Sequence, residues 1–289
     1  MLYTVGTVQD LAIKYLTSKG DVELRPWWSN YGCMFTEHLM IKLHYEWFKS
    51  TQVKAAQWEA QLRADVASYY ASEESASTSD DAVDTKETTS SSLSEKESYL
   101  AILMLSLRQI IASNVPTIHE DYRNATIFQK EISSDGKINT VDVIYPALPF
   151  YHYANPNMLR HLLEPVFEYQ ENGFYDSYGK FAMHDIGRWY PHAIGYDSNA
   201  KEDEPMPVEE CGNMIIMAYA YYKAACNVNY LEQHYRILRQ RVEYLVEYSL
   251  YPEHQTTTGK RSTPYSKQQS PLTHRNQTTS TTRWPTRPT

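Results

Sequence analysis

The sequence predicts an all-α protein built as an array of helical hairpins. Apolar residues recur at three- and four-residue steps over about residues 34–70, 155–172 and 229–251, which is the spacing of one face of an α-helix. Two further segments, 99–112 and 212–225, are apolar almost all round, as is typical of a buried inner helix. Inner apolar helices that alternate with outer amphipathic ones predict stacked hairpins around a common centre.

The first half of the chain provides two of these helices and the segment between them. The predicted helix at 34–70 places Trp47, Trp58 and Leu62 on its apolar stripe and contains no Pro or Gly. Residues 71–98 are dominated by Ser, Thr, Asp, Glu and Lys, which predicts an exposed or disordered insertion. The run YLAILMLSLRQIIA at 99–112 then predicts a buried inner helix.

The pattern changes at residues 128–145, where Asp135-Gly136 stands between short alternating runs and predicts a β-hairpin. Pro156 suits the first turn of the next helix, and Gly173 suits its end. The last amphipathic helix ends at Pro252. Beyond about residue 255 the periodicity is lost among Thr, Gln, Arg and Pro, which predicts a disordered or non-homologous tail.

Composition limits the classes of partner. The formal net charge of −8 argues against a nucleic acid or an anionic membrane, because both require clustered Lys and Arg. The chain has 25 Tyr and 6 Trp against 7 Phe, which suits either a cleft for polar small molecules or Tyr packing at helix edges. We therefore expect a small-molecule substrate, while the oligomeric state is not specified.

Cofactor and targeting signals are not found in the sequence. The three cysteines, Cys33, Cys211 and Cys226, have no CxxC spacing, and no HExxH or EF-hand pattern occurs, so no metal or other cofactor is predicted. The first residues, MLYTVGTVQDLAIKYL, lack the basic and apolar regions of a secretory signal, and no run approaches the ~18 apolar residues of a membrane span.

Several long segments resemble the fungal glutaminase A family. They include LRPWWS at 24–29, FQKEISSDGKINTVDVIYPALPFY at 128–151, KFAMHDIGRWYPHAIGY at 180–196 and DEPMPVEECGNMIIMAYAY at 203–221. The resemblance implies a secreted, extracellular enzyme that hydrolyses L-glutamine to L-glutamate and ammonia. It also implies an all-α fold, a partial (α/α)6 six-hairpin toroid with short β-hairpin elements in its loops.

The resemblance divides the chain into three parts. Residues 1–28 are expected to be a linker or lead-in segment, residues 29–254 a partial six-hairpin domain with the insertion at 71–98, and residues 255–289 the tail. Family members are considerably longer, so the chain is expected to be a partial copy. An unclosed ring exposes the faces of inner helices, and an inactive, non-catalytic remnant is therefore an alternative to an active enzyme.

Candidate catalytic residues cluster near the Pro-interrupted loop that follows residue 180. Carboxamide hydrolysis needs a base to activate water, an acid for the leaving ammonia and donors for the developing oxyanion. Asp185, Glu209 and Glu210 are the candidate acid/base set. The alternatives are an Asx-turn from Asp185 to Gly187 and simple complementation of a helix dipole by the two glutamates. Cys211 is expected to be a packing residue rather than a nucleophile.

Substrate-binding candidates come from several parts of the chain. An arginine can bind the substrate α-carboxylate, an Asn side chain can bind an amide, and aromatic rings can form the walls of a pocket. The alternatives are that the tryptophans pack in the core and that the arginine at 108 is a buried structural ion. The candidates are His184, Arg188, Tyr190, Asn213, Trp27, Trp28, Asp142 and Arg108. A carbohydrate-active hydrolase that uses two carboxylates across an aromatic cleft is the second functional alternative.

Overall fold

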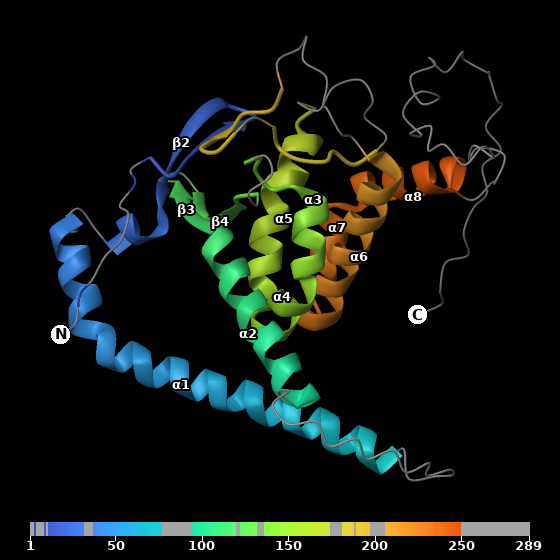
Figure 1. The fold of residues 1–289 in the computed structure, drawn as a ribbon. Helices are drawn as coiled ribbons and strands as arrows, with labels where there is room; N and C mark the ends of the chain where they lie inside the picture. Colours follow the sequence, from blue (N-terminus) through green and yellow to red (C-terminus); the bar gives the residue numbers. More distant parts are fainter. Residues whose placement is uncertain are drawn as a thin grey trace, which may run out of the picture.

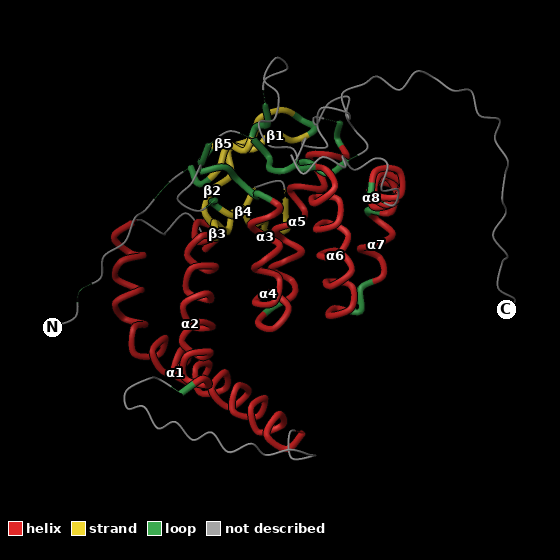
Figure 2. The backbone as a smooth tube through the Cα atoms, turned by 45° about the vertical axis from the view of Figure 1, so that its right-hand side comes forward, coloured by secondary structure: helices red, strands yellow, loops and turns green. Residues whose placement is uncertain are grey.

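A computed structural model describes residues 3, 9, 11–31, 37–76, 94–119, 122–131, 136–173, 181–187, 189–196 and 206–249. A five-stranded sheet lies across one end of a group of helices, which run away from it roughly side by side (Figures 1 and 2). The longest helix, α1 (Glu37–Ala76), crosses the opposite end of the group beside α2 (Glu95–Ser113) (Figure 1). None of the described helices combines the length and hydropathy that a membrane crossing requires.

The remaining elements are short. The strands are β1 (Ile13–Thr17), β2 (Gly20–Pro26), β3 (Asn114–His119), β4 (Tyr122–Gln129) and β5 (His192–Ala193). The other α-helices are α3 (Val141–Ile144), α4 (Leu148–Ala154), α5 (Pro156–Glu171), α6 (Pro207–Ala225), α7 (Val228–Gln233) and α8 (Tyr235–Tyr248). Two 3-10 turns, η1 (Trp27–Tyr31) and η2 (Tyr145–Ala147), complete the list.

The sheet is mixed and draws on three distant parts of the chain. Its strand order is β4-β3-β2-β1-β5, with antiparallel pairs except for the parallel pair of β1 and β5. The β1–β2 hairpin turns at Gly20, whose φ of +105° lies in the region that favours glycine. The side chains of β1 alternate between buried and half-buried positions, so its buried set, which includes Tyr15, faces the core.

The prediction of an all-α protein with a partial (α/α)6 toroid is wrong. The described elements include a five-stranded mixed sheet, and they do not form such a toroid. The sheet escaped detection because β3 pairs with β2, and β5 with β1, between segments that are far apart in sequence. The predicted domain boundaries after residues 28 and 254 stay predictions. Residues 13–26, within the segment expected to be a linker, contribute two strands of the sheet.

Two local predictions also need correction. Of the hairpin expected at 128–145, the structure contains the end of β4 and a single β-bridge between Lys130 and Ile138. Residues 141–144 are helical and form α3, and Asp135 lies outside the described residues. Helix α2 is present but is not an inner buried helix, because Leu100 is its single buried residue while Ile102 and Leu105 are 62% and 56% exposed. Its apolar composition therefore does not show that it is enclosed in the core.

Helices α5, α6 and α8 confirm the helical periodicity of the second half. Pro156 occupies the first turn of α5, as expected, and Asn155 caps the helix through its side chain. The predicted stripe of α5 is buried, with Leu162, Leu163 and Val166 at 0% exposure. This helix packs against β4, α4 and α6, and the Tyr15 hydroxyl of β1 donates a hydrogen bond to its Pro165 carbonyl. It therefore forms the centre of the core that holds the loops above it.

His234 joins α5 to the junction of α7 and α8. Its ring is 1% exposed, stacks on Phe167 at 4.2 Å and lies 3.0 Å from Glu171 through Nδ1 and 3.9 Å from Glu164 through Nε2. Burial favours a lower pKa, but the two carboxylates outweigh it and raise the pKa of His234 to about 9. The charged imidazolium is thus the form that the folded protein stabilises.

We expect this imidazolium to make stability depend on pH. Because the folded pKa is about 9 against an ordinary histidine value of 6.5, its contribution is complete below pH 6.5 and is lost as pH rises through 9. The loss amounts to at most about 3 kcal/mol of unfolding free energy. Urea unfolding at pH 6 and pH 9 measures it, and His234→Gln should reduce the difference. An unchanged difference in that variant would exclude His234 as its source.

Candidate functional site

Three polar side chains from three separate segments converge beside the sheet. Asp142 lies in the first turn of α3, His184 in the loop at 181–187, and Glu210 in the first turn of α6. One carboxylate or ring atom from each lies within 4.8 Å of the others. His184 and Glu210 are buried, whereas the Asp142 side chain is 30% exposed, so the cluster reaches solvent on the side of Asp142. We call these three residues the acidic-histidine cluster.

Backbone hydrogen bonds fix the loop that carries His184. The Val141 amide donates to the His184 carbonyl at 2.7 Å, and the Ile186 amide donates to the Ile138 carbonyl at 3.1 Å. On the other side, the Ala182 amide donates to Cys211 Sγ in α6 at 3.2 Å. The loop is therefore held between the segment that leads into α3 and the first turn of α6.

Asp185 fixes the orientation of the His184 ring. One of its carboxylate oxygens lies 2.8 Å from His184 Nδ1, the Gly187 amide donates to the other at 2.6 Å, and the Tyr196 hydroxyl lies within 2.9 Å of both. Lys137 Nζ adds an ion pair at 3.6 Å. Because Nδ1 is engaged by Asp185, Nε2 faces Asp142 Oδ1 at 3.5 Å.

Two glycines allow the loop to fold back on itself. A Cβ atom at Gly187 would lie 2.6 Å from the backbone carbonyl carbon of Gly195, and a Cβ atom at Gly195 would overlap the Tyr169 hydroxyl. The Gly195 amide also donates to the Ile186 carbonyl at 2.7 Å. This close approach of two backbone segments supports the Asx-turn of Asp185 and, through it, the His184 ring.

Burial and mutual proximity shift the titration of the cluster. Burial and the charge of Asp142 raise the pKa of Glu210 to about 9. Burial disfavours the charged form of His184, but the nearby carboxylates of Asp142 and Asp185 outweigh that effect and raise the pKa of His184 to about 10. The buried Glu210 carboxyl is thus held in its neutral form and the His184 ring in its charged form near neutral pH.

Two buried oxygen atoms of the cluster have no hydrogen-bond partner among the described protein groups. They are Glu210 Oε1 and Asp142 Oδ1, whereas Glu210 Oε2 accepts a hydrogen bond from Asn213 Nδ2 at 3.2 Å. Burying such atoms without a partner costs about 1–3 kcal/mol each, so they mark a place where a further group binds. A water molecule, a substrate N–H group or a metal ion would each meet this requirement.

The structure brings together five of the residues singled out in the sequence: Asp142, His184, Asp185, Glu210 and Asn213. The Gly187 amide donates a hydrogen bond to the Asp185 carboxylate, which is the Asx-turn considered above as the alternative to a catalytic role. Asp185 therefore supports His184 and does not face the cluster. Their catalytic and binding roles stay predictions.

The other candidates lie elsewhere. Glu209 is exposed on α6, since neighbouring helix positions cannot share a face, and the Tyr190 hydroxyl donates to Gln9. Trp27 and Trp28 lie in η1, which packs on β2 and β3. Arg108 is exposed on α2, and its expected burial is wrong. Arg188 lies outside the described residues.

Lys137 and Tyr196 were missed in the sequence. Tyr196 lies 11 residues after Asp185, beyond β5, so its closeness in sequence gave a usable signal. Lys137 gave none, because a lysine beside a predicted turn is normally solvated and nothing in its spacing indicates a buried partner. Cys211 is the packing residue that was expected, since burial raises the pKa of its thiol to about 11 and its sulfur accepts the Ala182 amide.

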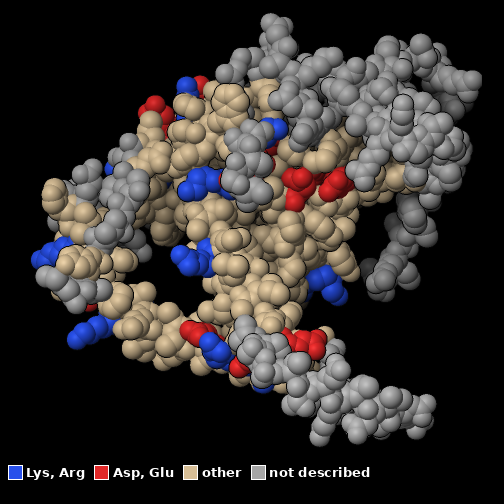
Figure 3. Space-filling model, viewed as in Figure 1, with Lys and Arg blue, Asp and Glu red and all other residues tan. Residues whose placement is uncertain are grey.

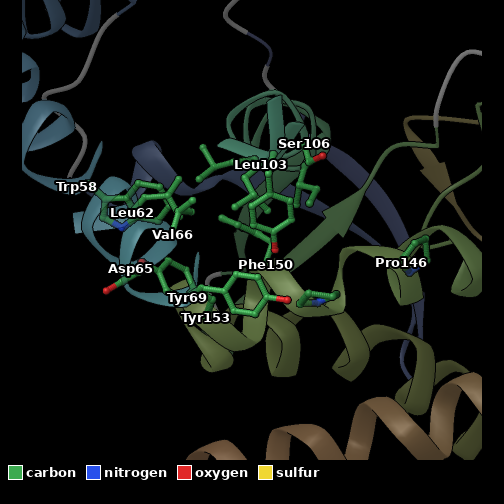
Figure 4. A pocket seen from close by; sticks show the side chains of 14 residues that line it. Trp58, Leu62, Asp65, Val66, Tyr69, Leu103, Ser106, Pro146, Phe150 and Tyr153 are labelled. Carbon is green, nitrogen blue, oxygen red and sulfur yellow. Dashed lines mark hydrogen bonds between the residues drawn. The ribbon is translucent and has the colours of Figure 1, made fainter. Parts of the chain in front are cut away.

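A separate cavity of about 450 Å³ lies between α1, α2 and α4 (Figure 4). Aromatic and aliphatic side chains line most of it, including Trp58, Tyr69 and Phe150. Its carboxylate, Asp65, accepts a hydrogen bond from the Tyr153 hydroxyl, and no residue of the acidic-histidine cluster lines it. Because Asp65 is its single carboxylate, the cavity offers little acid/base chemistry. On the face shown in Figure 3, the Lys, Arg, Asp and Glu residues are scattered and do not gather around one opening.

Comparisons with known proteins identify the family. A model of the glutaminase A six helical-hairpin domain matches residues 94–270, and the chain belongs to this family. The match extends beyond residue 255, where the tail was predicted to begin. It includes all three residues of the acidic-histidine cluster.

Two curated relatives support this assignment. Glutaminase A of Aspergillus oryzae (strain ATCC 42149 / RIB 40) is 38% identical over 260 residues, which cover 89% of this chain and 33% of that protein. "Probable glutaminase/05536" of Arthroderma benhamiae (strain ATCC MYA-4681 / CBS 112371) is 32% identical over 216 residues, which cover 74% of this chain and 21% of that protein. The chain thus spans about a third of the first relative and a fifth of the second, and no solved structure matches it.

Proposed function

We propose that the chain hydrolyses the side-chain carboxamide of L-glutamine to L-glutamate and ammonia at the acidic-histidine cluster. Membership of the glutaminase A family supports the reaction and the substrate class. The observation that carries the location is the convergence of Asp142, His184 and Glu210 within 4.8 Å, with two buried carboxylate oxygens that lack a partner. The family resemblance also implies a secreted protein with a small-molecule substrate, and both are part of the proposal.

The chemistry follows from these groups. Water attacks the amide carbon, the C–N bond breaks, and the proton that water loses ends on the leaving nitrogen, so that ammonia and a carboxylic acid form. The carboxyl groups of Asp142 and Glu210 flank the space in which the water binds, while His184 contributes Nε2 on the third side. The Asp142 carboxylate accepts the proton of the water, and Glu210, whose pKa of about 9 keeps its carboxyl protonated at neutral pH, donates a proton to the leaving nitrogen. The proton on Asp142 then returns to Glu210. Asn213 holds Glu210 through Oε2 and keeps Oε1 directed at this space.

Ammonia release from L-glutamine by the purified chain tests this function. We expect saturable ammonia release from L-glutamine that is at least about tenfold faster than from L-asparagine. The side chain of L-asparagine is shorter by one methylene group, so its amide would not reach the position that the L-glutamine amide occupies. Glutamate should appear in equal amount, and a panel of glycosides should give no turnover. Turnover of a glycoside with none of glutamine would instead support a carbohydrate-active hydrolase, and no turnover of either would support the non-catalytic alternative.

A further inference from the structure

We propose that Asp142, His184 and Glu210 bind a divalent first-row transition-metal ion, with Zn²⁺ as its best representative. The inference goes beyond the proposed reaction, because binding of the ion can be measured without any substrate. It contrasts with the sequence-based expectation of no metal site, which rested on short-range spacing motifs. Residues 142, 184 and 210 lie in separate segments, so no motif of that kind could reveal them.

The donor set suits such an ion. One imidazole nitrogen and two carboxylate oxygens form a mixed nitrogen and oxygen set, and two carboxylates balance the charge of a divalent cation. Mg²⁺ and Ca²⁺ prefer sets made of oxygen alone. The imidazole therefore favours zinc or a neighbouring transition metal over these harder ions.

The distances allow one ion to reach all three residues. With metal–ligand distances of about 2.0–2.2 Å, tetrahedral geometry places ligand atoms about 3.3–3.6 Å apart. His184 Nε2 and Asp142 Oδ1 are already 3.5 Å apart, and all three donors lie within 4.8 Å of one another. The limit of 4.8 Å exceeds the tetrahedral spacing by only about 1.2–1.5 Å, so small side-chain shifts would bring all three donors to bonding distance.

The surrounding hydrogen bonds orient the donors as the groups around bound metal ions do. A metal-binding histidine usually donates its second ring nitrogen to a carboxylate, and metal-binding carboxylates are themselves hydrogen-bonded. Here His184 Nδ1 contacts Asp185 at 2.8 Å, and Asn213 holds the Oε2 atom of Glu210. These contacts engage His184 Nδ1 and Glu210 Oε2, so an ion would take His184 Nε2 and Glu210 Oε1.

A second observation points independently to a missing partner. Glu210 is 0% exposed, yet its Oε1 atom has no hydrogen-bond partner among the described groups, and neither does Asp142 Oδ1. A cation between them satisfies both oxygens. Three protein ligands leave a fourth position for water, and the partial exposure of Asp142 gives the solvent side of the site.

The test uses the full chain after treatment with EDTA and dialysis. Titration calorimetry with Zn²⁺ should show one saturable site, and Zn²⁺ should raise the melting temperature in a manner that EDTA reverses. Mg²⁺ and Ca²⁺ at the same concentration should shift the melting temperature far less. No saturable binding of Zn²⁺ to the wild-type chain would overturn the proposal, whatever the protein does with glutamine.

Matched variants locate the site. Glu210→Gln and Asp142→Asn should each weaken Zn²⁺ binding by at least about tenfold, because each removes a charged ligand. Glu209→Gln changes the neighbouring exposed glutamate in the same turn, and His192→Gln changes an exposed histidine of β5; both should bind as the wild type does. Circular dichroism checks that every variant is folded. Wild-type affinity in both folded ligand variants would place the ion elsewhere and refute the assignment.

Discussion

Replacing Glu210 by Gln is expected to lower kcat/KM for ammonia release from L-glutamine by at least about a thousandfold. Gln has nearly the same shape, so packing is retained, but it can neither donate a proton to the leaving nitrogen nor become the charged ligand of a cation. The Glu210 side chain is buried and its Oε1 atom has no hydrogen-bond partner among the described groups, so we expect this atom to contact the substrate or the water. Steady-state ammonia release measures the effect.

Glu209 provides the control for this substitution. It lies one position earlier in the first turn of α6, has the same side chain near the helix N-terminus and is exposed. Glu209→Gln should therefore keep kcat/KM within about threefold of the wild type, since it loses only a macrodipole contribution of about 1 kcal/mol or less to helix stability. Equal losses in the two variants would mean that a general effect on α6, and not the cluster, explains the result.

Gly187→Ala is expected to destabilise the protein by about 3 kcal/mol or more. The added Cβ atom would lie 2.6 Å from the backbone carbonyl carbon of Gly195, and backbone cannot move aside as a side chain tip can. The φ of +79° adds strain for any residue with a Cβ atom. The change also disturbs the amide that donates to Asp185, so ammonia release should fall together with the urea midpoint.

Gly173→Ala separates these two causes. Gly173 has the same φ of +79°, but a Cβ atom there would meet no atom within 4 Å. This variant should lose only about 1–2 kcal/mol, the cost of a left-handed backbone conformation for an L-residue. If the two alanine variants proved equally stable, the close contact between residues 187 and 195 would not contribute as described.

The helices were predictable because their signal is local. The buried stripe of α5, with Leu162, Leu163 and Val166, repeats at helical spacing and begins after Asn155-Pro156, so periodicity and capping agree. The sheet was not predictable in this way. Two of its pairs, β2 with β3 and β1 with β5, join distant segments, and strands of few residues become stable only when such segments meet.

The candidate site shows the same division. His184 and Glu210 lie close in sequence, within a loop and the helix it leads into, and both were identified from residue chemistry. Asp142 was predicted to bind the substrate. Its position beside His184 could not be predicted, because it depends on the backbone hydrogen bonds of Val141 and Ile186, which hold the start of α3 against the loop of His184. The choice between Glu209 and Glu210 also required the structure, because the helix phase decides which of two neighbours is buried.

The most direct measurement of the central claim, that Asp142, His184 and Glu210 act as one site, compares kcat/KM for L-glutamine among single variants and their combination. Asp142→Asn, His184→Asn and Glu210→Gln should each reduce it to a similar residual level, and the triple variant should be little worse, because residues that act as a unit are not additive. Wild-type activity in any folded single variant, or losses that multiply in the triple variant, would contradict the account.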